Sequence, residues 1–231
     1  MFVQLLLAHL LGDFILQPTS WVAHKERNKL RSKYLYLHTL IHFLLVFLFL
    51  WNLNQWWIAL LVAGTHFIID WAKLQFQNSS TKRAWFFIDQ LLHLSVLASI
   101  SIFFEAYINW NYIFNQEHLK FAAGLLFVSY PASILVKTLI GAYTPEEDST
   151  DKSNDSLQNA GKYIGILERI LVFIFIYVNH WEGVGFMIAA KSVFRFSDLA
   201  QAKQRKLTEY VLIGTLLSFG LAILTGVVVK M

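Results

Sequence analysis

The sequence LLLAHLLGDFILQ, at residues 5–17, carries two ionisable side chains, His9 and Asp13, within an otherwise apolar segment. These residues are four positions apart, and residues i and i+4 lie on the same face of an α-helix. The same spacing recurs three times in the first hundred residues, at His38 and His42, His66 and Asp70, and Asp89 and His93. The pattern predicts four apolar helices that each present a pair of potential metal ligands on one face.

The composition is typical of a protein that crosses a membrane with several helices. Of the 231 residues, 56% are hydrophobic and 15% are charged, and the mean hydropathy is +0.50. The apolar runs are continuous, whereas the strands of membrane β-barrels alternate polar and apolar residues. We therefore expect an all-α fold, a polytopic membrane helix bundle. The net charge of +4 is small and lies in the connectors, so it does not indicate nucleic-acid binding.

The apolar runs predict about eight transmembrane helices. Their approximate bounds are residues 2–17, 34–51, 55–76, 84–108, 118–142, 160–177, 182–197 and 208–229. We expect two membrane halves, residues 1–108 with the His and Asp pairs and residues 109–231 with buried basic and acidic residues. Residues 143–159 are rich in polar and acidic side chains and predict a flexible cytoplasmic loop.

The distribution of Lys and Arg predicts the topology. The connectors after the first, third and seventh predicted helices are basic, whereas those after the second and sixth carry no Lys or Arg. Basic connectors remain in the cytoplasm, so we expect both termini outside a bacterial cytoplasmic (inner) membrane. With this topology all four ligand pairs lie in the cytoplasmic leaflet, within about three helical turns of its surface. They could therefore meet in one site that faces the cytoplasm.

A cluster of ionisable groups inside a membrane needs compensation, because each costs roughly 2.5–3.5 kcal/mol at mid-membrane on insertion scales. A divalent metal ion supplies it. The chain has no cysteine, so the ligands must be imidazoles, carboxylates, amides or backbone oxygens. Imidazole and carboxylate suit zinc best, with manganese or iron as alternatives. Eight candidate ligands allow one or two ions, with Asp13 or Asp89 as a catalytic base.

Two other readings of the His and Asp pairs stay open. Polar residues also join membrane helices by hydrogen bonds, and a His/Asp pathway can carry ions or protons through a transporter. No inverted repeat accompanies the pairs, which are confined to the first four predicted helices.

The second half carries a separate set of cationic residues in or beside apolar runs: Arg169, Lys191 and Arg195. Lys191 and Arg195 are four positions apart, so the set predicts a site for a phosphate or another anionic group. The alternative is structural, because ion pairs with Glu168 and Glu209 could simply hold these helices together.

Four sequence segments carry a family resemblance: HLLGDFILQ, the His38-x3-His42 pair, THFIIDWAK and FFIDQLLH. Together they resemble a bacterial family of multi-pass membrane proteins known only as a domain of unknown function, with the HLLGDF-type start at His9–Phe14 as its hallmark. The resemblance covers about residues 2–95 and implies no particular chemistry. The style of the site is also similar to membrane-bound metal-dependent hydrolases and ceramidase-like enzymes, which is an analogy of site alone.

These observations favour a membrane-embedded, metal-dependent hydrolase that acts on a lipid or membrane-associated substrate from the cytoplasmic side. An ion- or proton-coupled transporter and a non-catalytic, metal-binding membrane sensor are the alternatives.

Overall fold

A computed structural model describes residues 1–105, 115–141, 154–201 and 205–231, with side chains described outside 154–160 and 194–208. Every element of regular secondary structure in these ranges is a helix, so the all-α prediction is confirmed. The chain forms two compact units, Met1–Ala123 and Gly124–Met231. The division predicted after residue 108 falls in a segment outside the described residues.

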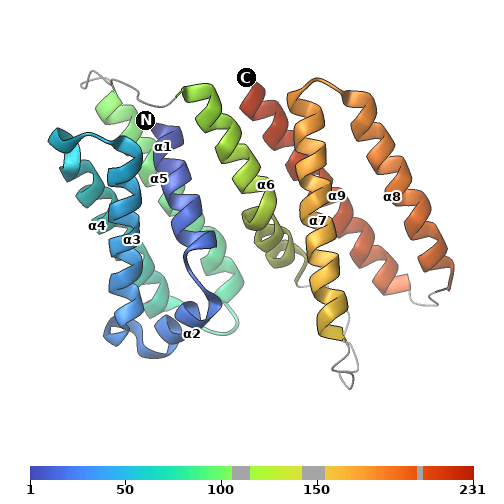
Figure 1. The fold of residues 1–231 in the computed structure, drawn as a ribbon. Coiled ribbons are helices and arrows are strands. Elements are labelled where there is room, and N and C mark those ends of the chain that lie inside the picture. The colour runs from blue at the N-terminus through green and yellow to red at the C-terminus, as the bar shows by residue number, and fades with distance from the viewer. Residues whose placement is uncertain (106–114, 142–153, 202–204) are drawn as a thin grey trace. The chain divides into compact units, whose positions relative to one another are not determined.

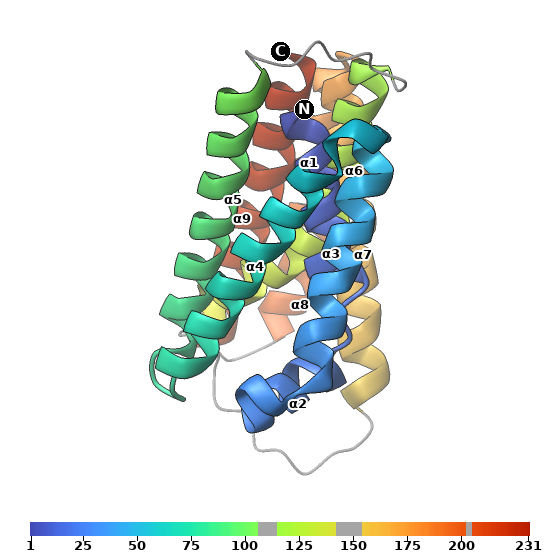
Figure 2. The same cartoon turned by 90° about the vertical axis from the view of Figure 1, so that its left-hand side faces the viewer.

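The first unit contains the helices that carry the predicted ligand pairs (Figure 1). Its elements are α1 (Phe2–Leu10), the π-helical turn η1 (Leu11–Ile15), α2 (Thr19–Asn28), α3 (Lys33–Leu50), α4 (Trp56–Phe76), α5 (Lys82–Glu105) and the start of α6 (Gln116–Ile140). Helix α1 packs against α3 and α5, and α4 packs against both α3 and α5. Figure 2 shows α3, α4 and α5 running alongside one another. These contacts leave a space between four helices that side chains from each of them fill.

Apolar side chains fill the part of this space around the N-terminal half of α1. Leu5, Val46, Ile58 and Leu97 belong to one buried cluster to which α1, α3, α4 and α5 all contribute. On α3, the next buried residues towards the N-terminus are histidines, since His42 and His38 lie on the same face as Val46. The apolar cluster therefore holds the four helices together next to the polar cluster.

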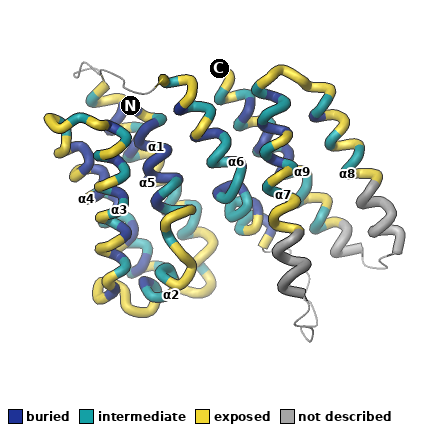
Figure 3. Tube along the Cα trace, in the orientation of Figure 1, coloured by how far each residue is buried: buried dark blue, intermediate teal, exposed yellow. Residues whose placement is uncertain are grey.

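The opposite face of α3 is apolar and exposed. A stripe of leucines with about half of their surface accessible runs along it at Leu40, Leu44 and Leu48. Figure 3 shows the same division into a buried and an exposed side along the helices of the first unit. Polar side chains inside and leucines outside are the arrangement expected when lipid surrounds the helices.

The second unit consists of the remainder of α6 with α7 (Asn154–Tyr177), α8 (Trp181–Gln201) and α9 (Arg205–Lys230). Helix α7 packs against α8 and α9. Since α7 begins at Asn154, the last part of the predicted loop at 143–159 is helical, and residues 142–153 lie outside the described residues.

Several helices are long and apolar enough to cross a membrane. Five qualify among the described residues: α3, the segment 53–76 that contains α4, α5, α6 and the part of α9 from Glu209. The segments Phe2–Ile15 and Thr19–Arg31, bent by 83°, qualify together as a sixth, broken span. The predicted count of eight is not confirmed. Side chains of α7 and α8 are described only at residues 161–177 and 181–193, and each of these stretches is shorter than a membrane span requires.

Candidate metal centre

The structure brings all eight predicted ligand residues together inside the first unit. Seven of them are at most 5% exposed: His9, His38, His42, His66, Asp70, Asp89 and His93. The eighth, Asp13, has a side chain that is 10% exposed. Each of the helices α3, α4 and α5 contributes one pair, and His9 and Asp13 come from α1 and the π-helical turn η1. The spacing in sequence thus places the pairs on the buried face of each element.

The carboxylate of Asp13 lies at the middle of the cluster. Its Oδ1 atom is 3.0 Å from His42 Nε2, 3.3 Å from His38 Nε2 and 3.4 Å from His66 Nε2. The Nε2 atoms of His38 and His66 are themselves 3.0 Å apart. A neutral imidazole has only one N–H, so these contacts cannot all be good hydrogen bonds. Their lengths match the spacing of ligand atoms around a zinc ion, about 3.3 Å for tetrahedral bonds of roughly 2.0–2.1 Å.

The other oxygen of Asp13 faces α1 and α5. Oδ2 lies 3.9 Å from His9 Nε2 and accepts a hydrogen bond of 3.1 Å from Gln90 Nε2. The same amide nitrogen donates to Asp89 Oδ2 at 3.2 Å, and Gln90 Oε1 lies 3.3 Å from His9 Nε2. Gln90 therefore joins the two carboxylates and orients His9. Sequence reasoning missed Gln90, because residues i and i+1 lie on different faces of a helix and its position directly after Asp89 was therefore no signal.

Asp13 occupies a turn of π-helix, which the sequence did not predict. The N–H of Leu16 donates to Leu11 O at 2.8 Å, a bond that spans five residues. Gly12 lies in this turn, and a Cβ atom added there would be 2.4 Å from His42 Nε2. Only glycine permits so close an approach of the imidazole to the backbone. π-Helical turns occur frequently at functional sites because they redirect side chains within a helix.

Two lysines, the buried Lys25 and the partly buried Lys73, form ion pairs with carboxylates of the cluster. Lys25 Nζ, on α2, donates to Asp70 Oδ2 at 2.6 Å, and Lys73 Nζ, on α4, donates to Asp89 Oδ2 at 2.8 Å. In the sequence, Lys25 is one of several basic residues in a connector. Its position relative to the others did not distinguish it from them. Lys73 did have a signal, since it follows Asp70 by three residues and shares its helix face.

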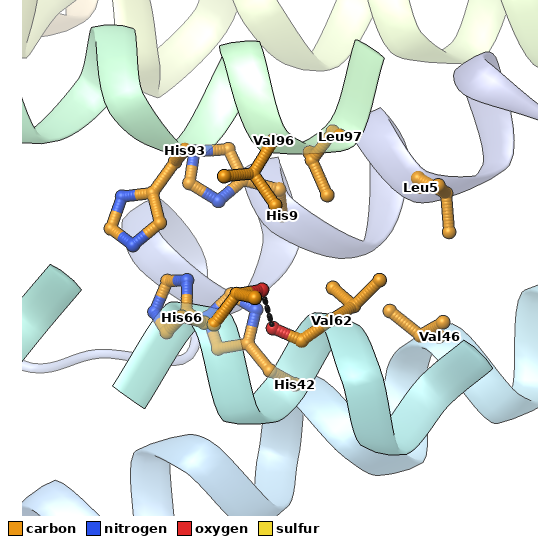
Figure 4. A pocket seen from close by; sticks show the side chains of 10 residues that line it. Leu5, His9, His42, Val46, Val62, His66, His93, Val96 and Leu97 are labelled. Carbon is orange, nitrogen blue, oxygen red and sulfur yellow. Dashed lines mark hydrogen bonds between the residues drawn. The ribbon is translucent and has the colours of Figure 1, made fainter. Parts of the chain in front are cut away.

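A small cavity of about 10 Å³ adjoins the cluster. Four imidazoles face it, as Figure 4 shows: those of His9, His42, His66 and His93. Apolar side chains of the core and Thr65 close the rest of its wall. This volume is close to the least that admits one water molecule, for which about 10–15 Å³ is needed.

Some buried polar atoms of the cluster lack a hydrogen-bond partner within the described part of the chain. They are His38 Nδ1, Asp89 Oδ1, His93 Nδ1 and His93 Nε2. Buried polar groups are nearly always paired, so an exception calls for an explanation such as a bound ion.

Three overlapping sets of side chains could each hold a metal ion, with ligand atoms within 4.8 Å of one another. The sets are His9, Asp13, His42 and His66; His38, His66 and Asp70; and Asp13, Asp89 and His93. Every predicted ligand belongs to at least one set. Asp13 belongs to two of them, in keeping with its central position.

The cationic residues predicted to bind an anion lie in the second unit and have protein partners. Arg169 is 4% exposed and donates to Val128 O at 2.6 Å, Ser129 O at 2.9 Å and Ser218 Oγ at 3.0 Å. Lys191 forms an ion pair with Glu168. These contacts favour the structural alternative for both residues. The side chain of Arg195 lies outside the described residues.

The fold and the cluster define a class: an all-α protein with several helices suited to a membrane and a buried centre of imidazoles and carboxylates. The chain belongs to the family described as "Protein of unknown function (DUF3307)", whose sequence model matches residues 1–121. The predicted resemblance to a family of unknown function is therefore confirmed. No curated protein matches the chain, and no solved structure matches it. The matched residues include the whole His and Asp cluster.

Proposed function

We propose that the chain is a membrane-embedded, metal-dependent hydrolase that acts on a lipid or membrane-associated substrate. A divalent ion, preferably zinc, is held by His9, Asp13, His42 and His66. The observation that carries the proposal is the convergence of three imidazoles on the Asp13 carboxylate: His42 and His66 Nε2 lie 3.0 and 3.4 Å from Oδ1, and His9 Nε2 lies 3.9 Å from Oδ2. Separate helices provide these groups, so their meeting is a property of the fold.

Hydrolysis is the chemistry that such a centre serves best. Imidazole and carboxylate ligands leave zinc a strong Lewis acid that makes a bound water nucleophilic near neutral pH. The cavity beside His9, His42 and His66 has room for about one water molecule. Asp13 acts as a ligand because imidazoles surround it. His93 lines the cavity, and Asp89 Oδ1 lies 3.7 Å from His93 Nδ1; both residues serve as acid–base groups or as further ligands.

The distribution of basic residues indicates from which side of the membrane the substrate reaches the centre. The basic segment of α2 lies at the same end of the first unit as the start of α5, since Lys82 forms an ion pair of 2.6 Å with Glu26. Basic segments of this kind remain in the cytoplasm of bacteria. We therefore propose that the centre faces the cytoplasmic side of the inner membrane, where it meets lipid head groups or membrane-bound substrates.

The test is turnover by the purified full-length chain in lipid nanodiscs. Labelled lipid esters, amides and phosphoesters are supplied to the zinc-loaded protein, to chelator-treated protein and to His42→Ala. We expect hydrolysis by the zinc-loaded protein, loss on chelation, recovery with added zinc and no turnover by His42→Ala. The exposed His180 provides a matched control, and His180→Ala should hydrolyse at the wild-type rate. A zinc-loaded protein that hydrolyses none of these bond types contradicts the hydrolase assignment.

A second function, an ion- or proton-coupled transporter, is favoured by one feature of the cluster. Titratable side chains form an almost continuous path from Lys25 through Asp70, His38 and Asp13 to Asp89 and Lys73, with Gln90 as the only member that does not titrate. Successive atoms along the path are at most 3.8 Å apart. Metal-driven proton flux in proteoliposomes without turnover would support transport. Bound metal with neither activity would support a sensor.

A further inference from the structure

We infer that the centre holds a second divalent ion, bound by Asp89 and His93, with Asp13 as a carboxylate that bridges the two ions. The inference rests on the proposed metal centre and makes it dinuclear. It assigns Asp89 and His93 as ligands, and it predicts a stoichiometry that a mononuclear centre cannot give.

The first argument is the unsatisfied chemistry of Asp89 and His93. Asp89 is 1% exposed and His93 is 3% exposed. Lys73 and Gln90 occupy Asp89 Oδ2, but Asp89 Oδ1 has no hydrogen-bond partner among the described residues, and neither ring nitrogen of His93 has one. Asp89 Oδ1 and His93 Nδ1 are 3.7 Å apart. A carboxylate oxygen and an imidazole nitrogen, both buried and both without a hydrogen bond, are what a metal ion requires.

The second argument is the position of Asp13 between two sets of ligands. Oδ1 faces the Nε2 atoms of the imidazoles on α3 and α4, whereas Oδ2 accepts from Gln90, which also donates to Asp89. Asp13 therefore belongs both to the set with His9, His42 and His66 and to the set with Asp89 and His93. A carboxylate whose two oxygens face different ligand sets can bridge two ions.

The third argument is the closeness of the two sets. The rings of His66 and His93, one from each set, are stacked with centroids 4.0 Å apart. The ring of His9 lies 5.2 Å from that of His93. Two-metal hydrolytic centres place their ions about 3.5–4 Å apart. Since rings from the two sets lie next to each other, two ions bound by these sets would also be close together.

Charge indicates the class of substrate that a dinuclear centre takes. The three carboxylates and two lysines of the cluster leave one net negative charge when the imidazoles are neutral. Two divalent ions reverse this balance and leave a strongly positive centre in a low-dielectric environment. Such a centre binds an anionic group, so we assign phosphoesters as the substrate class, ahead of uncharged esters and amides.

The test measures metal content and metal–metal coupling on the full-length chain. Zinc per chain is determined after purification without chelators for the wild type, Asp89→Asn, His93→Gln and the control His118→Ala. His118 is exposed. In parallel, wild-type protein is loaded with Mn²⁺ and its electron paramagnetic resonance spectrum is recorded. We expect two zinc ions in the wild type and control, one in each variant of the second site, and an exchange-coupled Mn²⁺ signal.

Any other result overturns the inference of a second ion. The results also show whether the proposed metal centre itself survives. One zinc per wild-type chain that survives His93→Gln, with an uncoupled Mn²⁺ signal, overturns the second ion and leaves a mononuclear centre. A wild-type chain without zinc overturns both the second ion and the proposed metal centre. The wild-type spectrum decides the matter even if the variants fail to fold.

Discussion

Glycine at position 12 decides whether His42 can reach its place in the centre. A Cβ atom at this position would lie 2.4 Å from His42 Nε2 and 2.5 Å from His42 Cε1. Gly12→Ala must therefore displace the imidazole, and we expect metal affinity to fall about 10–100-fold, the range seen when groups that orient metal ligands are altered. Isothermal titration with zinc measures this. Gly64→Ala is the matched control, since a Cβ atom on Gly64 meets nothing within 4 Å. Equal losses in both variants would contradict the account.

We expect Lys25 to contribute more to the free energy of unfolding than a lysine in an exposed basic segment does. Its ammonium group and the carboxylate of Asp70 are 2.6 Å apart, with side chains only 6% and 8% exposed. Removing one member of a buried pair leaves an uncompensated charge and costs about 3–5 kcal/mol. Lys25→Met should therefore lower the thermal midpoint of unfolding in detergent.

Two comparisons make the Lys25 prediction specific. Lys82→Met breaks an ion pair whose lysine is 59% exposed, and such exposed pairs contribute only about 0–1 kcal/mol. Lys25→Met combined with Asp70→Asn removes both charges and should recover part of the lost stability. A Lys25→Met protein as stable as Lys82→Met would contradict a stabilising buried pair between Lys25 and Asp70.

At the scale of single residues, the sequence indicated which residue types form the centre but not the contacts between them. Four pairs at i and i+4 were sufficient to identify all eight His and Asp residues, because helix periodicity alone places each pair on one face. Lys25 and Gln90 could not be found in this way. Their contacts depend on how α2 and α5 pack against α4 and η1, and no local pattern encodes that packing.

At the scale of elements, the first helical segment differs most from its prediction. Residues 2–17 were expected to form one short span, but α1 ends at Leu10, and η1 continues it as a π-helical turn to Ile15. After Pro18 the chain turns by 83° into α2. A proline stop was predictable from residue 18. The π-turn was not, because Gly12 is required by a contact with His42 on another helix.

Helix α7 is joined to α6 and α9 by Arg169, which predicts a structural effect without loss of metal. The guanidinium donates to two carbonyl oxygens beside Pro131, Val128 O and Ser129 O, and to Ser218 on α9. Arg169→Met removes these buried hydrogen bonds, and each costs about 1–3 kcal/mol when a partner is left unpaired. We expect a clear fall in the thermal midpoint and an unchanged zinc content.

The control for Arg169 is Lys162→Met. Lys162 donates to the Tyr130 hydroxyl from an exposed position, so its replacement should change the midpoint little. If Arg169→Met instead kept its stability and lost affinity for inorganic phosphate, the anion-binding role predicted from the sequence would be restored.

At the scale of the whole molecule, the first of the two compact units contains both the family match and the His and Asp cluster. The family match at residues 1–121 and the first compact unit, Met1–Ala123, end within a few residues of each other, and the entire cluster falls inside both. Hydropathy predicted the all-α fold, whereas the predicted count of eight spans is not confirmed: five helices qualify within the described residues, or six with the broken first span.

The topology can be tested with single cysteines because the chain has none of its own. Asn54 lies in the uncharged turn before α4, and Ser79 lies in the turn between α4 and α5 next to Lys82 and Arg83; both are exposed. Positive residues stay inside, so a membrane-impermeant maleimide added to intact bacterial spheroplasts should label Asn54→Cys and leave Ser79→Cys unlabelled until lysis. The reverse pattern would place the centre on the outer side.

The central claim is that the buried His and Asp cluster is a metal centre, and the metal content of the purified chain tests it most directly. Zinc is measured in the wild type, in His38→Ala/His42→Ala and in the matched double variant His118→Ala/His180→Ala, which changes two exposed histidines. The account predicts stoichiometric zinc in the wild type and the matched variant and its loss from His38→Ala/His42→Ala. A correctly folded wild-type chain without bound metal, purified in the absence of chelators, would contradict it.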